Sequence, residues 1–129
     1  MRIPFARPQI DDNEKKAVNK VLSGNILVHG PKIVEFEKEF SKFTKSQYAL
    51  GVSSCTAGMH LFYYALNVQK GDEVIIPAQT HVATAMAVEA VGAKPVFVDS
   101  EDCTGNIDIN KIEKKISKKT KVITVVHYL

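Results

Sequence analysis

The stretch GDEVIIPAQTHVATAMAVEAVGAKPVFV, residues 71–98, decides the fold of this chain. It contains two short runs rich in valine and isoleucine, residues 74–77 and 95–98, which have the length and composition of buried strands. Residues 81–91 lie between these runs and can form a helix. A strand, a crossover helix and a second strand predict a right-handed βαβ unit with parallel strands.

The same alternation extends to both sides of this unit. Residues 48–52 and 122–126 are further short apolar runs that predict strands, and residues 56–67 and 109–117 predict helices. The resulting order βαβαβαβ predicts an α/β fold, with a mainly parallel sheet and helices on both faces.

The first third of the chain is predicted to be helical. Residues 11–23 begin with acidic side chains suited to a helix N-terminus and stop at Gly24, and residues 31–44 begin with Pro31, a favoured first helical residue. An apolar stripe follows the second helix (Ile33, Phe36, Phe40 and Phe43). We therefore expect an N-terminal helical segment, residues 1–46, followed by the first part of an α/β domain, residues 47–129.

Composition excludes several classes of protein. A chain of 129 residues that is 45% hydrophobic and 24% charged has the make-up of a soluble globular domain, and a net charge of +3 indicates no nucleic-acid partner. The lysines between positions 111 and 121 are interpreted as a solvated helix face. Cys55, Cys103 and the four histidines lack metal-ligand spacing. Without a signal peptide or an apolar run of about 18 residues, we expect a cytoplasmic protein with no membrane partner.

Ligands of open α/β sheets gather at the carboxyl ends of the strands, which directs attention to residues 53–58, 78–81, 99–102 and 127–129. Residues 53–58 match neither a dinucleotide-binding fingerprint nor a Walker loop. They are small and hydroxyl residues that open a helix, where backbone N–H groups favour a phosphate. The alternative is simple capping of that helix by Ser53 or Ser54. His81 could stack on a planar cofactor, or it could be a surface residue at a helix start.

An ordered set of motifs along the whole chain resembles the DegT/DnrJ/EryC1/StrS family of sugar aminotransferases. These motifs are residues 3–8, 23–31, 36–40, 52–61, 71–77, 82–85, 92–99 and 126–128. The resemblance implies the fold type I architecture of the aspartate aminotransferases, with pyridoxal 5′-phosphate as cofactor. It also implies a homodimer, in which the loop from Asn25 to Gly30 contributes to the neighbouring subunit's active site.

The resemblance assigns three residues to the cofactor. Thr56 and Ala57 match the positions that bind the cofactor phosphate, through backbone amides and the Thr56 hydroxyl. His81 matches the position whose side chain stacks on the pyridine ring, where Phe, Tyr or Trp is more usual. Asp99 also matches a family position and is interpreted as structural.

Pyridoxal chemistry further needs a Schiff-base lysine and an acid that faces the pyridinium nitrogen. In the family both follow the match at residues 126–128, so we expect them beyond Leu129. None of the 15 lysines of the chain matches the lysine motif. We therefore assign no catalytic residue, and we expect these 129 residues alone to be inactive.

The resemblance implies the N-terminal part of an aminotransferase that moves an amino group from glutamate to a nucleotide-linked keto sugar. Residues 53–60 are most similar to members that act on uridine-diphosphate 4-keto sugars in polysaccharide pathways. Two alternatives stay open. One is a dehydratase of the same family, in which histidine replaces the Schiff-base lysine, and the other is a short phosphate-binding or structural module without catalysis.

Overall fold

The computed structural model describes residues 3–4 and 6–127, so the motif residues Phe5, Tyr128 and Leu129 lie outside the described residues. The chain divides into two compact units, Met1–Gly51 and Val52–Leu129. The predicted boundary after residue 46 precedes this division. Each unit is described by itself.

The first unit contains two helices, α1 (Asp12–Leu22) and α2 (Pro31–Thr44). A capping box begins α1, because Asp11 accepts a hydrogen bond from the Asn13 N–H at 2.7 Å and Glu14 accepts one from the Asp11 N–H at 2.8 Å. Neither helix has a buried residue, and Phe43 of α2 is 85% exposed. The apolar stripe of α2 is thus uncovered within its own unit.

The second unit is an α/β unit with three strands. Its elements, in chain order, are α3 (Cys55–Ala65), β1 (Glu73–Pro77), α4 (Val82–Ala90), β2 (Lys94–Val98), α5 (Ile109–Ile112), the 3₁₀ helix η1 (Glu113–Lys115) and β3 (Thr120–Ile123). The strands lie in the order β2-β1-β3, and both pairings are parallel. Ile75 at the centre of β1 is in register with Val96 of β2 and Ile123 of β3.

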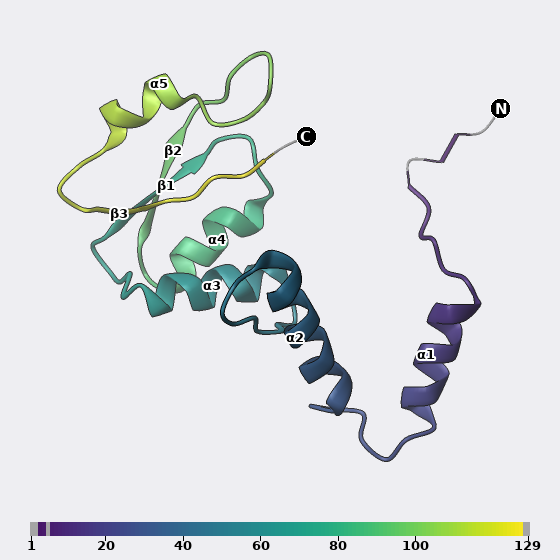
Figure 1. Ribbon diagram of the computed structural model, residues 1–129. Helices are drawn as coiled ribbons and strands as arrows, with labels where there is room; N and C mark the ends of the chain where they lie inside the picture. The colour runs from purple at the N-terminus through teal and green to yellow at the C-terminus, as the bar shows by residue number, and fades with distance from the viewer. Residues whose placement is uncertain (1–2, 5, 128–129) are drawn as a thin grey trace. The chain divides into compact units, whose positions relative to one another are not determined.

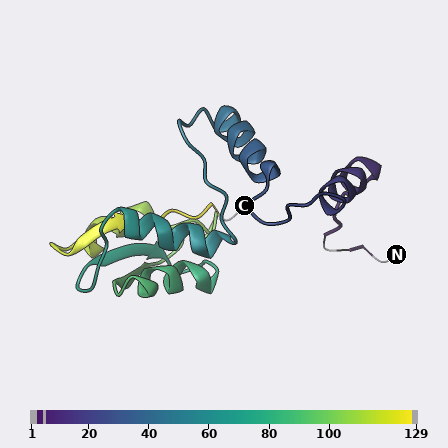
Figure 2. The same cartoon turned by 90° about the horizontal axis from the view of Figure 1, so that it is seen from below.

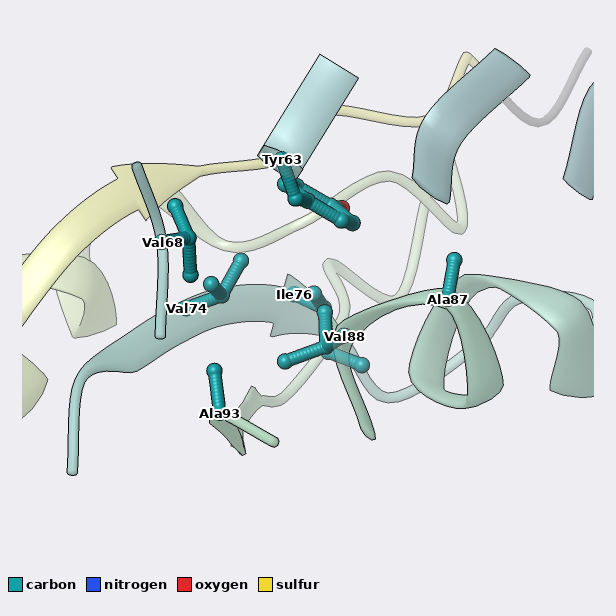
Figure 3. Close-up of a cluster of buried hydrophobic side chains, with 7 residues drawn as sticks. All are labelled: Tyr63, Val68, Val74, Ile76, Ala87, Val88 and Ala93. Atoms are coloured by element: carbon teal, nitrogen blue, oxygen red, sulfur yellow. The ribbon is translucent and has the colours of Figure 1, made fainter. Parts of the chain in front are cut away.

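Helices cover both faces of this sheet, as the sequence predicts (Figure 1). Val74 and Ile76 of β1 pack with Tyr63 of α3 and with Val88 of α4 on one face (Figure 3). The side chain of Ile75 points to the other face, because side chains alternate along a strand. There it forms a second cluster with Val98 and Ile107, and Ile112 of α5 packs against this cluster. The cluster on the first face also contains Val68, Ala87 and Ala93.

The prediction of a strand at residues 48–52 is wrong. The backbone of this run finds other partners: the Tyr48 carbonyl accepts a hydrogen bond from Ser46 Oγ at 2.9 Å, and the Gly51 N–H donates to Glu37 Oε1 at 2.8 Å. Tyr48 and Leu50 are 79% and 73% exposed. A run rich in strand-forming residues becomes a strand only where a neighbouring strand pairs with it, and none of the described strands does so.

Two other predicted elements have different bounds. The predicted helix at 109–117 is shorter, because α5 passes into η1 and Ile116 is extended. Thr120 then forms a turn with Ser117, in which each residue's N–H donates to the other at 2.9–3.1 Å. This turn starts β3 at Thr120, earlier than the predicted residue 122.

Candidate functional site

The first turn of α3 has a well-defined cap. Ser54 is the N-cap residue, and its Oγ accepts a hydrogen bond from the Ala57 N–H at 3.1 Å while its carbonyl accepts one from the Gly58 N–H at 3.1 Å. Of the two serines that the sequence left open as caps, Ser54 is therefore the one that performs this role. Thr56 is half-buried, and the turn contains no acidic residue.

This turn retains hydrogen-bond donors at the positive end of the helix dipole. Within the described part of the chain, the N–H groups of Cys55 and Thr56 have no acceptor, whereas that of Ala57 is engaged by Ser54. Two free amides, a neighbouring hydroxyl and the helix dipole form a suitable environment for a dianion. The residues present therefore fit a phosphate group, with Thr56 better placed to donate than Ala57.

His81 is the N-cap residue of α4. Its Nδ1 accepts a hydrogen bond from the Ala83 N–H at 3.1 Å, and its side chain is exposed. The structure thus agrees with the interpretation of His81 as an exposed residue at a helix start. Because that bond uses one ring nitrogen in the plane of the imidazole, the faces of the ring remain able to stack on a planar group.

The start of α4 is fixed by a further pair of hydroxyl groups. The Oγ1 atoms of Thr80 and Thr84 lie 2.9 Å apart, and Thr84 is buried. This bond ties the residue before His81 to the first turn of the helix, which limits the positions that the histidine can take.

The structure brings the first turn of α3 and the start of α4 to the same end of the α/β unit. The two helices pack against each other, and their N-termini lie toward the carboxyl ends of the strands (Figures 1 and 2). Thr56 and Ala57 on one helix and His81 on the other are therefore on the side of the sheet where open α/β folds bind ligands.

Asp99, which follows β2, belongs to a small ionic network. Its carboxylate accepts hydrogen bonds from Lys111 Nζ at 3.1 Å and from the Ser100 N–H at 3.0 Å, and Lys111 also lies 3.3 Å from Asp108. The hydrogen bond from Lys111 lowers the pKa of Asp99, and the same contact raises the pKa of Lys111. These contacts join the loop after β2 to α5, which supports the structural interpretation of Asp99. A hollow of about 480 Å³ lies beside this loop, lined by Gln79 and residues 99–105.

The loop from Asn25 to Gly30 lies in the first unit and is largely exposed. Its consecutive apolar residues Ile26, Leu27 and Val28 are all more than half exposed, and His29 adopts a left-handed conformation with φ of 52°. Exposed apolar side chains in a loop are typical of a contact surface. The predicted contact with a second subunit stays a prediction.

All 15 lysines lie in the described part of the chain, and every one of them is exposed. A lysine that forms a Schiff base is usually kept as a free amine by its surroundings, such as a desolvated pocket, and none of these exposed side chains lies in such a pocket. The residues described contain no cluster of three or more His, Cys, Asp or Glu that could hold a metal ion. Among the described helices, none is both long enough and apolar enough to cross a bilayer.

One buried polar contact has no counterpart in the sequence predictions. Tyr63, the fully buried residue of α3, is 1% exposed, and its hydroxyl lies 2.7 Å from the Oγ1 of Thr124, just after β3 (Figure 3 shows the tyrosine among its apolar neighbours). Helical spacing predicts that an aromatic residue packs inward. It does not predict which hydroxyl group will meet it from a segment 61 positions away.

A sequence model of the DegT/DnrJ/EryC1/StrS aminotransferase family matches residues 8–129. Among curated relatives, the UDP-4-amino-4-deoxy-L-arabinose–oxoglutarate aminotransferase of Shewanella sediminis is 42% identical over 126 residues, which cover 98% of this chain and 32% of the relative.

Solved structures agree with this match. A protein of Streptococcus pneumoniae, named as a sugar aminotransferase and solved in its PMP form, is 37% identical, with a TM-score of 0.94 over 99% of this chain and 32% of its own. The aminotransferase from Psychrobacter cryohalolentis is 35% identical, with a TM-score of 0.89 over 97% of this chain and 32% of its own. The chain thus spans about a third of the length of these relatives, and its fold is that of their corresponding part. It belongs to the DegT/DnrJ/EryC1/StrS aminotransferase family.

Proposed function

We propose that the protein is a pyridoxal-phosphate-dependent aminotransferase, and that this chain supplies the part of its active site that binds the cofactor phosphate. The observation that carries the proposal is the first turn of α3, where the N–H groups of Cys55 and Thr56 are free at a helix N-terminus without an acidic residue in the turn. Family membership supports it, as do the PMP and PLP forms of the pneumococcal relative.

The residues of this chain would bind and orient the cofactor. The amides of Cys55 and Thr56 and the Thr56 hydroxyl hold the phosphate, and the face of His81 packs on the ring. Ala57 keeps the backbone accessible through its small side chain. When bound, the cofactor would supply the electron sink that transfer of an amino group needs.

We further propose that the amine donor is glutamate and that the acceptor is a nucleotide-linked keto sugar, in a polysaccharide pathway of the cytoplasm. The name of the Shewanella relative, which contains a uridine-diphosphate sugar and oxoglutarate, supports this choice. The test is a half-reaction with protein expressed from the complete gene. With glutamate, one 2-oxoglutarate should form per bound cofactor. Turnover of a keto sugar without an amino donor would instead indicate a dehydratase.

The proposed phosphate site can be tested by introducing a negative charge at an exposed position of the first turn of α3. Cys55 is exposed at the first position of α3, so both Cys55→Asp and its neutral partner Cys55→Ser should fold. An acid in a first helical turn stabilises the helix, but it repels a phosphate that binds there. We expect Cys55→Asp to weaken pyridoxal phosphate binding at least tenfold, while Cys55→Ser binds as the wild type does. Equal affinities of the two variants would contradict the proposed site.

We also propose that the cofactor-binding lysine and the acid that faces the pyridinium nitrogen are not among these 129 residues. Reduction with borohydride in the presence of pyridoxal phosphate, followed by peptide mapping, tests the proposal for the lysine. No lysine within residues 1–129 should carry a stoichiometric label. A single stoichiometrically labelled lysine among the 15 would show that the amine lies in this chain.

The proposed homodimer contact can be tested at the loop from Asn25 to Gly30. Leu27→Asp introduces a charge into its exposed apolar part and should lower the molar mass measured by light scattering if the loop contacts a second subunit. Val34→Asp, on the exposed surface of α2, is the control for charge alone. An unchanged mass for Leu27→Asp would remove the loop from the interface.

A further inference from the structure

The contact between Tyr63 and Thr124 joins the two elements that border the proposed phosphate site. Tyr63 belongs to α3, whose first turn holds the free amides, and Thr124 follows β3 at the carboxyl end of the sheet. The Thr124 backbone is itself fixed, since its N–H donates to the Ile75 carbonyl of β1 at 2.8 Å. The hydroxyl pair therefore connects α3 to the central strand through a residue whose backbone is bonded to that strand.

On the side of β3, the N-terminal half of α3 packs on the core cluster through Met59. A hollow of about 460 Å³ separates it from the end of β3, lined by Cys55, Gly58, Met59 and Phe62 on the helix and by residues 122–125 opposite. Tyr63 and Thr124 both line this hollow. Because the helix does not pack tightly against the strand there, its direction depends more strongly on the contacts that it does make.

The hydrogen bond is also costly to break. Tyr63 is 1% exposed within the apolar cluster of Val74, Ile76 and Val88, and its partner Thr124 is half-buried, so a Tyr63 hydroxyl without this bond would have little access to water. A buried hydroxyl that loses its partner retains the full cost of desolvation. The bond thus restrains the position of the helix relative to the end of β3.

We infer that Tyr63, through its hydrogen bond to Thr124, is a positioning residue that keeps the first turn of α3 in the geometry that accepts the cofactor phosphate. The inference rests on the proposed function. Without the bond, α3 takes more than one position, and only a fraction of molecules has the turn ready for the phosphate. The apparent affinity falls by that fraction.

The test compares pyridoxal phosphate with pyridoxal, which lacks the phosphate, on protein expressed from the complete gene. We expect Tyr63→Phe and Thr124→Val each to raise the Kd of pyridoxal phosphate by about three- to tenfold, the range that one hydrogen bond supplies. The Kd of pyridoxal should stay the same. The double variant should lose no more than either single variant, because both remove the same bond.

Two matched controls keep the test specific. Thr124→Ser keeps a hydroxyl at this position and should bind pyridoxal phosphate with the affinity of the wild type. Tyr64→Phe removes the neighbouring, exposed hydroxyl and should change neither Kd. If Tyr63→Phe lowers the Tm while the ratio of the two Kd values stays at the wild-type value, the contact is only structural and the inference is wrong. If the wild type itself does not prefer pyridoxal phosphate to pyridoxal, the proposed phosphate site fails, and the inference fails with it.

Discussion

His81 combines a backbone contact with an accessible aromatic ring. Its Nδ1 caps α4 through the Ala83 N–H, while the faces of its imidazole remain available at the carboxyl ends of the strands. A phenylalanine, which is more usual in the family, would offer a larger face but no acceptor for that N–H. The histidine thus supplies a cap for α4 that a phenylalanine could not supply.

Two substitutions of His81 separate these properties. His81→Asn keeps a capping oxygen and removes the ring, so stability should stay near the wild-type value while cofactor affinity falls. His81→Phe keeps a ring and removes the cap, so it should lose about 0.5–1 kcal/mol of unfolding free energy and bind the cofactor at least as well. Urea unfolding and cofactor titration measure the two effects. Unchanged affinity in His81→Asn would show that the ring does not stack.

The network of Asp99, Lys111 and Asp108 predicts a pH dependence of stability. The hydrogen bond from Lys111 holds the pKa of Asp99 below its ordinary value of 3.8. Burial raises the pKa of Asp108, but hydrogen bonds from the Asn110 N–H and from Lys111 outweigh it. Because both carboxyl pKa values are lowered, the two carboxylates contribute stability above about pH 3.8. This contribution is lost as the pH falls through the lowered pKa values. Because the pKa of Lys111 is raised, this lysine contributes stability below pH 10.5, and the contribution is lost as the pH rises from there through the raised pKa.

Lys111→Met should therefore unfold at a lower urea concentration than the wild type at pH 7, and the difference should shrink below pH 3.8. The effect is small, because the pair of Lys111 and Asp99 is exposed to solvent. Lys114→Met removes a nearby charge outside these ion pairs and should give no such pH dependence. A difference between wild type and Lys111→Met that does not shrink as the pH falls below 3.8 would have another cause than this network.

At the scale of elements, the strands predicted at 74–77 and 95–98 agree with β1 and β2 to within one residue, whereas the strand predicted at 122–126 shares two residues with β3. The sequence located β1 through its continuous buried apolar run, and β3 has no buried residue. The prediction failed at residues 48–52, where the same composition is present but no described strand pairs with it. Pairing depends on a neighbour that a local pattern cannot reveal. The sequence indicated that small residues open α3. For the same reason, it could not show that Ser54 accepts a hydrogen bond from the Ala57 N–H, or that the hydroxyl groups of Tyr63 and Thr124 form a hydrogen bond.

The cap of α3 gives a prediction about the stability of this element. Ser54→Ala removes the acceptor of the Ala57 N–H and should cost about 1 kcal/mol of unfolding free energy. Ser53 is also exposed and precedes the cap, so Ser53→Ala should change the free energy by less than about 0.5 kcal/mol. Urea unfolding of both variants gives the comparison. Equal losses would mean that the two serines share the capping role.

At the scale of the whole molecule, the two units differ in how their apolar residues are covered. The α/β unit has a core on both faces of its sheet, whereas the helices of the first unit, 11 and 14 residues long, bury none of their side chains. Isolated helices of this length are marginal in water. We therefore expect the helical state of the first unit to depend on a surface that covers its apolar stripe.

A peptide of residues 1–51 should consequently show little helix by circular dichroism in water. Its helical content should also fall gradually on heating, without a cooperative transition. A second peptide with Phe36→Ser and Phe40→Ser should behave in the same way, since the stripe contributes nothing when it is uncovered. A cooperative helical transition in the first peptide would show that the unit is stable by itself.

The order β2-β1-β3 leaves two outer edges, and they are not equivalent. The Lys94 N–H and the Val98 carbonyl of β2 bond to the β1 side at 2.9 Å and 2.7 Å, so the backbone of the alternate residues Pro95 and Phe97 faces outward. Proline has no N–H to donate, which makes that edge a poor template for another strand. The edge of β3 contains no proline. The edge of β3 is therefore the more favourable of the two for pairing with a further strand, including one from a misassembled second molecule.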